Sequence, residues 1–193
     1  MKIGLLFLLF MIGASACHPI ENDASAKGNI GNLDSLKGTW TLKYVFLGDV
    51  IDQPCSSSKM SHDITLNITN QLVDNTTDTF VINGKSAVNS IFGGLKILSF
   101  DENTHIGKAA ITQLGSTKMA GPEDLMNCEL RYFTLLNATK DFKIFRDTDG
   151  KTYLHLGDFK TDNQPSRNGG MYLIYIKNLF CFRCFFLLYN KRT

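Results

Sequence analysis

Apolar and polar side chains alternate along several short stretches of the chain, which is the pattern of half-buried β-strands. The alternation is continuous from Trp40 to Leu47 and predicts that Trp40, Leu42, Tyr44 and Phe46 share one face of a strand. The same period of two predicts further strands at 64–68, 79–83, 95–100, 107–114, 142–146, 152–156 and 171–177. The chain is therefore predicted to be mainly β.

One segment has helical periodicity instead. Five residues recur at spacings of three and four and would share one helix face: Leu125, Glu129, Tyr132, Phe133 and Leu136. Pro122 suits the first helical position, where its missing amide would have no partner. Glu123 and Asp124 follow it and would favour the positive end of the helix dipole. We predict a helix over 122–137.

The first residues have the layout of a secretory signal peptide. Lys2 precedes an apolar run too short to span a bilayer, and small residues at 14–16 lead to Cys17. This segment resembles a bacterial lipoprotein signal, although Ala14 stands where such signals usually have leucine. Cleavage after Ala16 would make Cys17 the lipidated first residue, so we expect a bacterial envelope protein lipid-anchored to a membrane, the outer membrane. The alternative is an ordinary secreted protein that begins with Cys17.

The rest of the chain divides by composition. After the signal peptide (1–16) we expect a lipid-anchored flexible tether (17–35) rich in Asn, Gly, Ala and Ser, a domain (36–177), and an apolar C-terminal extension (178–193). The formal net charge of +2 falls to about +1 once Lys2 is removed. Basic residues are scattered among acids, so nucleic acid is not expected as a partner.

Three motifs of the predicted domain carry a family resemblance. Gly38-Thr39-Trp40 matches a Gly-x-Trp signature at the first strand. Gly84, Asn89 and Gly93 or Gly94 match a central loop motif, with Val88 in the position of its cysteine. Thr117, Met119 and Pro122 match a later motif, with Gly121 in the position of its cysteine. Together these motifs resemble the META domain of HslJ-like envelope lipoproteins.

The resemblance implies a mainly antiparallel β fold (α+β), a curved sheet or open barrel with one amphipathic helix packed on it. It also implies a role in stress response or envelope integrity, and it supplies no catalytic residue. If the loop 84–94 and the turn 116–122 lie side by side, they form a candidate interaction surface. Its residues would be Gly84, Asn89, Gly93, Thr117, Met119 and Pro122.

Little else in the sequence points to chemistry. The four histidines have no spacing that would preset metal ligands, and His155 on a predicted strand is interpreted as a structural residue. The acidic stretch 147–150 is interpreted as a hairpin turn, with Gly150 in the left-handed conformation. We expect no catalytic site, metal or cofactor.

Four cysteines besides Cys17 allow three complete pairings. A bridge between Cys55 and Cys128 is one possibility. Cys181 and Cys184 have the Cys-x-x-Cys spacing of redox sites, which by itself is a weak signal. The sequence therefore leaves open a thiol redox protein that uses Cys181 and Cys184.

The C-terminal run 171–189 is long enough for a membrane helix, but Lys177 and Arg183 would each cost about 2.5–3.5 kcal/mol in its centre. Alternation up to Lys177 fits a last strand better. The sequence leaves four alternatives for the extension that follows: it packs on the barrel, contacts the membrane surface, contacts a partner, or is a poorly ordered end with no selected role.

The sequence supports two hypotheses for a protein without catalysis. The first is a non-enzymatic lipoprotein that binds an unknown protein or a small apolar ligand, and the second is a lipocalin-like carrier of a hydrophobic molecule.

Overall fold

Nine strands and one helix make up the part of the chain that the computed structural model describes, residues 33–55, 60–159 and 169–178. In chain order they are β1 (Gly38–Leu47), β2 (Val50–Asp52), β3 (Thr65–Leu72), β4 (Thr79–Lys85), β5 (Ser90–Asp101), β6 (Ile106–Ser116), α1 (Glu123–Asn137), β7 (Asp141–Arg146), β8 (Thr152–Asp158) and β9 (Met171–Lys177). All predicted strands and the predicted helix are present, and β2 is an addition that the sequence pattern did not indicate.

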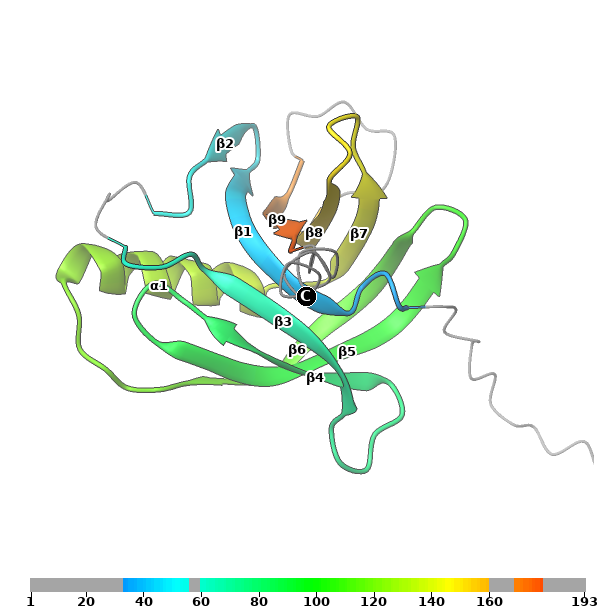
Figure 1. The fold of residues 1–193 in the computed structure, drawn as a ribbon, viewed down its shortest axis with the longest axis horizontal. Helices are drawn as coiled ribbons and strands as arrows, with labels where there is room; N and C mark the ends of the chain where they lie inside the picture. Colours follow the sequence, from blue (N-terminus) through cyan, green and yellow to red (C-terminus); the bar gives the residue numbers. More distant parts are fainter. Residues whose placement is uncertain (1–32, 56–59, 160–168, 179–193) are drawn as a thin grey trace, which may run out of the picture.

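The strands form a closed antiparallel barrel (Figure 1). Each strand from β3 to β8 pairs with the next along the chain, and β1 pairs with both β3 and β9, which closes the ring. The short strand β2 pairs with the end of β1 at 45–47. The predicted mainly antiparallel β class is therefore confirmed, and the barrel is closed rather than open.

A β-bulge in β1 decides which of its side chains face the interior. The register to β9 shifts between Leu42 and Tyr44, so one extra residue interrupts the alternation. Trp40 and Leu42 are buried before the bulge and Val45 after it, whereas Tyr44 is exposed. The prediction that Tyr44 and Phe46 share a face with Trp40 is wrong, because the extra residue moves both to the outside of the barrel.

Large apolar side chains fill the barrel interior. Trp40, Phe142 and Tyr175 are fully buried there, together with leucines and isoleucines from β3, β4, β5 and β8. The turn before β1 covers one end: Leu36 is fully buried and its carbonyl accepts a 2.8 Å hydrogen bond from Trp40 Nε1. Leu33 is also buried, so the packed domain begins inside the segment that the sequence analysis assigned to the tether.

Helix α1 packs where β6 and β7 separate. These two strands pair only through 106–108 and 141–143, and the helix contacts β6, β8 and β9. Pro122 is the N-cap residue and has an extended backbone, so the helix begins at Glu123, one residue later than the sequence analysis predicted. Leu125, Tyr132 and Leu136 face the barrel, and the Tyr132 hydroxyl lies 3.2 Å from that of Tyr175 inside the core. In the parts of the chain described here, no helix is long and apolar enough to cross a membrane.

Candidate functional site

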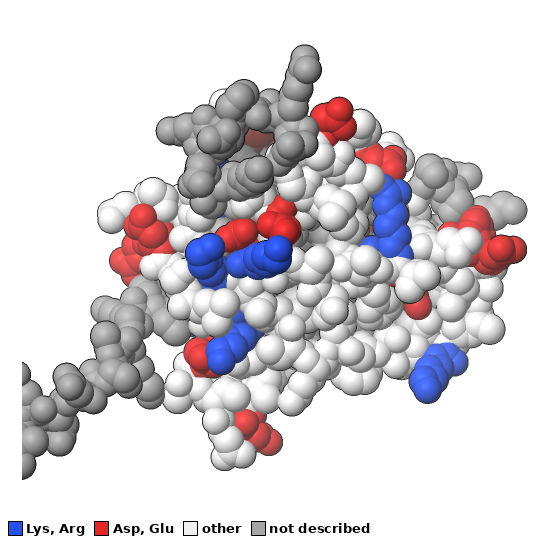
Figure 2. All heavy atoms as spheres, turned by 180° about the vertical axis from the view of Figure 1, so that it is seen from behind, with Lys and Arg blue, Asp and Glu red and all other residues white. Residues whose placement is uncertain are grey.

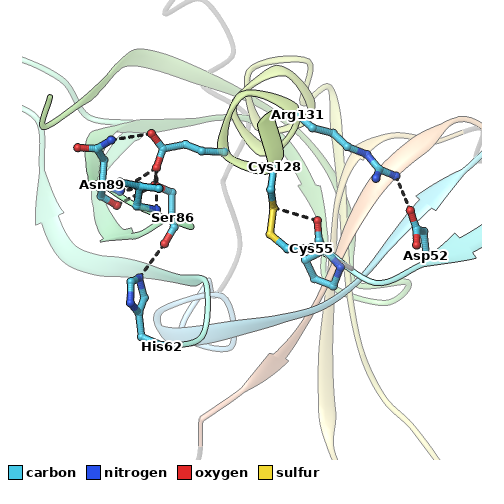
Figure 3. Close-up of a disulfide and its surroundings, with 10 residues drawn as sticks. Asp52, Cys55, His62, Ser86, Asn89, Cys128 and Arg131 are labelled. Atoms are coloured by element: carbon cyan, nitrogen blue, oxygen red, sulfur yellow. Dashed lines mark hydrogen bonds and ion pairs between the residues drawn. A yellow bond between two sulfur atoms is a disulfide. The ribbon is translucent and has the colours of Figure 1, made fainter. Parts of the chain in front are cut away.

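A buried carboxylate on α1 organises the loop between β4 and β5. Glu129 is 5% exposed and accepts hydrogen bonds from the Ser86 hydroxyl and from the backbone amides of Val88 (3.0 Å) and Asn89 (2.7 Å). The Asn89 side-chain amide donates a further bond of 2.7 Å to the second carboxylate oxygen (Figure 3). Burial alone would raise the pKa of Glu129, but these hydrogen bonds together outweigh it and place the pKa below its ordinary value. Glu129 is therefore a charged clamp for this loop.

Asn89 links the same loop to the turn after β6. It is 4% exposed, and its side-chain oxygen accepts hydrogen bonds from the Thr117 hydroxyl (2.8 Å) and the Met119 amide (2.7 Å). Its side-chain nitrogen also lies 3.3 Å from the Met119 carbonyl. The two loops that the sequence analysis proposed as an interaction surface therefore lie side by side, joined by one buried amide.

The two positions that carry cysteine in the family motifs are also neighbours. A Cβ atom added to Gly121 would lie 3.6 Å from the Cβ of Val88 and 2.9 Å from its Cγ2. The Val88 side chain thus fills the space next to Gly121, which has no side chain of its own. In this chain the two positions make a packed contact between Val88 and Gly121.

The six candidate surface residues have different roles. Thr117, Met119 and Pro122 are exposed, and the exposed fraction of Met119 is 56%. Asn89 is buried and links the two loops. The other two, Gly84 and Gly93, lie in β4 and β5, where strand neighbours leave little or no room for a side chain: the Thr65 carbonyl against Gly84 and the Thr112 carbonyl against Gly93. Of the candidate surface, only the turn 117–122 is exposed, and the loop that holds Asn89 supports it.

An ion pair fastens α1 to β2, and a disulfide fastens it to the segment after β2 (Figure 3). Cys55 and Cys128 are bridged, with their Cα atoms 5.6 Å apart, which selects this link from the pairings that the sequence left open. One helical turn on, Arg131 Nη2 lies 2.9 Å from the Asp52 carboxylate. Cys17, Cys181 and Cys184 lie outside the described residues, so the anchor and the Cys-x-x-Cys stay predictions.

Sequence reasoning missed the role of Glu129. The signal was present, because Glu129 is the one acidic residue on the predicted apolar face of the helix. An acid at such a position is buried only with hydrogen-bond donors around it. Those donors are backbone amides of a loop 40 residues away, and no pattern in the sequence identifies them.

The histidine nearest this cluster does not activate a nucleophile. His62 Nε2 lies 2.9 Å from the backbone carbonyl of Ser86, and its Nδ1 lies 3.1 Å from the Ser61 hydroxyl. The Ser86 hydroxyl is bonded to Glu129 and to the Asn89 carbonyl instead. His62 therefore supports the loop from the side opposite α1 and makes no base–nucleophile pair with Ser86 (Figure 3).

Metal-ligand groups and charge clusters are two other features that would mark a site in the described residues. Among the described residues, no group of three or more His, Cys, Asp and Glu side chains is placed to hold a metal ion. On the face shown in Figure 2, the acidic and basic side chains of the described residues are scattered in small groups. Two of the ion pairs in the structure are Lys108–Asp141 and Lys140–Asp158, both near the start of β7.

Comparison with known proteins gives one family. The model of the META domain family matches residues 33–163, more than half of the chain. A search of solved structures finds an NMR structure of a protein from Burkholderia xenovorans, with 20% sequence identity, a TM-score of 0.45, and coverage of 74% of this chain and 82% of that one. No curated protein matches the chain.

Proposed function

We propose that this chain, which belongs to the META domain family, is a non-enzymatic lipoprotein of the bacterial cell envelope that contributes to stress tolerance by binding a partner. The anchor would be a lipid on Cys17, most simply in the outer membrane. The binding surface would be the turn 117–122, with Met119 at its centre. The occupant would be a protein or a small apolar ligand.

The observation that carries this proposal is the bridging position of Asn89. Burying a carboxylate is unfavourable unless donors surround it, and here Glu129 receives its donors from a single loop, which in turn fixes the turn 117–122 through Asn89. The result is an exposed methionine on a backbone that is already ordered. Preorganisation of this kind lowers the entropy lost on binding, and methionine adapts its shape to varied apolar partners.

The packed interior does not favour the carrier hypothesis. The barrel is filled by Trp40, Phe142, Tyr175 and the leucines and isoleucines around them, so a ligand would have to displace core side chains. The redox hypothesis also lacks support in the described part of the chain, where Cys55 and Cys128 are bridged to each other.

The test compares two surface residues of equal exposure. Met119 and Leu98 are each 56% exposed, but Leu98 lies on β5 away from the turn. A strain that lacks the chain would be complemented with the wild type, Met119→Asp or Leu98→Asp, and its survival under antibiotic and heat stress measured. We expect Met119→Asp to fail and Leu98→Asp to complement, with both proteins equally stable to heat.

Full complementation by Met119→Asp would overturn the proposed surface. Asn89→Ala is a poor substitute test, because this side chain is buried and its loss would weaken the fold as well. The anchor is tested separately by the intact mass and detergent partitioning of the wild type and Cys17→Ala. A diacyl or triacyl mass increment that the variant lacks would support lipidation, and an unmodified soluble protein would contradict it.

A further inference from the structure

The outside of the barrel carries a continuous row of aromatic rings across β7, β8, β9 and β1. The ring of Phe145 lies 4.9 Å from that of His155, His155 lies 4.9 Å from Tyr172, and Tyr172 lies 4.7 Å from Phe46. Tyr153 stacks on Phe145 at 5.6 Å. These side chains point away from the core, because Leu154, Leu156, Leu173 and Tyr175 on the same strands point into it. We call this row the outer aromatic face.

Exposed apolar residues extend the outer aromatic face. Tyr44 pairs with Ile174 in the sheet, and Ile51 of β2 pairs with Phe46, so both lie on the same side of the sheet as the rings. Tyr44 is 44% exposed and Ile51 is 62% exposed. Burial has also lowered the pKa of His155 to about 4, so its imidazole is neutral at pH 7 and adds no charge to the face. Apolar patches of this kind on a soluble domain usually have an occupant.

The chain itself supplies an apolar segment at this place. After Asn178 it continues for 15 residues, 179–193, of which ten are Leu, Phe, Cys or Tyr and none is acidic. Asn178 is fixed beside β1: its amide donates a 2.9 Å bond to the Thr39 carbonyl, and its side-chain oxygen accepts a 2.8 Å bond from Thr41. The segment therefore begins directly after β9, the strand that runs through the outer aromatic face.

We propose that residues 179–193 fold back on the outer aromatic face and cover it. The length suits this role, since a 15-residue helix is about 22 Å long and the seven residues of β9 extend about 23 Å. A short connection places the segment at an effective concentration in the millimolar range near the face. The tail would therefore contact the outer aromatic face more readily than a separate partner could, and both apolar surfaces would be shielded from water.

Photo-crosslinking of the full mature chain tests this proposal. p-Benzoylphenylalanine replaces Tyr44 on the outer aromatic face or, as the control, Leu98 on β5. After irradiation, trypsin would release the tail as 178–183 and 184–191. We expect these two peptides to dominate the adducts from position 44 and to be absent from position 98. In a mixture of 15N-labelled and unlabelled protein, the adducts should join peptides of the same label.

A tail variant adds a second readout that leaves the domain intact. Leu187→Asp/Leu188→Asp should lower the yield of the position 44 adduct at least fivefold, with unchanged thermal unfolding of the domain. Unchanged yield in this variant would overturn the proposal. Adducts between unlike labels would identify a second copy as the occupant. On vesicles of phosphatidylethanolamine and phosphatidylglycerol, lipid adducts in place of tail adducts would identify the membrane as the occupant. A second copy, the membrane, or the absence of any tail adduct would each overturn the proposal.

Discussion

Two cysteines placed at Val88 and Gly121 should form a disulfide. The Cβ–Cβ distance of 3.6 Å between these positions lies within the range of natural bridges. The backbone at Gly121 is outside the left-handed region, so a side chain there meets no backbone strain. The one obstacle is the Val88 side chain, whose two methyl groups lie 2.9 and 3.0 Å from the added Cβ. Replacing both residues together removes it.

The stabilisation follows from the length of the loop that the bridge closes. From Val88 to Gly121 the separation is 33 residues, for which the chain-entropy estimate is about 3.7 kcal/mol at 25 °C. Glu129 and Asn89 already order both loops in the folded state, so little rearrangement is required. For a domain of this size the gain corresponds to roughly 7–15 °C in melting temperature.

The assay compares Val88→Cys/Gly121→Cys after air oxidation with Val88→Ala/Gly121→Ala, which has the same Cβ atoms and no link. Urea unfolding gives both free energies without a reductant, so that the Cys55–Cys128 bridge stays intact in each. Peptide mapping verifies the new pairing. Gly121→Ala alone should lower the free energy of unfolding, because its methyl group meets the stiff Val88 side chain.

Free thiols at both positions after oxidation would refute the reasoning, since they would show that Val88 and Gly121 do not lie together. A bridge that forms without raising the free energy of unfolding would refute the claim that the surrounding loops are already in a compatible arrangement.

Three other substitutions test the contacts around α1 and the outer aromatic face. Glu129→Gln sets an NH2 group against a donor whichever way its amide turns, because Ser86 and two loop amides donate to one carboxylate oxygen and the Asn89 side chain donates to the other. It should lower the free energy of unfolding by about 2–4 kcal/mol in urea titrations; an unchanged midpoint would contradict the clamp. Cys55→Ala/Cys128→Ala opens a 73-residue loop and should cost about 4 kcal/mol, which calorimetry would detect. Because the pKa of His155 falls from 6.5 to about 4 on folding, its contribution to stability is complete above pH 6.5 and is lost as the pH falls toward 4. Unfolding at pH 7 and pH 5 should show this loss in the wild type and less of it in His155→Phe, and an NMR titration of the imidazole near 6.5 would contradict the assignment.

Local periodicity was sufficient to predict the helix and every strand except β2. The strands from β3 to β9 and the helix were predictable because burial of one side of each element leaves a period of two or 3.6 in the adjacent residues. The pattern failed in β1, where the bulge places Tyr44 and Phe46 outside. A bulge adds one residue to an otherwise alternating strand, and nothing in the local alternation from Trp40 to Leu47 marks that residue.

The candidate site was only partly predictable. Asn89 and Met119 could be singled out by their motifs, whereas Gly84 and Gly93 in the same motif proved to be positions of close strand approach. Glu129 was visible as an acid on an apolar face but had no identifiable partner. Its partners are far away in sequence, and only the packing of α1 against the barrel brings them within hydrogen-bond distance.

By itself the sequence determined the class of the protein: a mainly β chain with one amphipathic helix, a predicted leader and a predicted lipid anchor. These properties depend only on the composition and spacing of residues close together in the chain, so they can be inferred without knowing the tertiary structure. The tertiary structure alone decided the closure of the barrel by β1 and β9, the contact of Val88 with Gly121, and the face on which the aromatic rings gather. Each of these joins residues distant in the chain, and which of them meet is decided only when all the strands have paired.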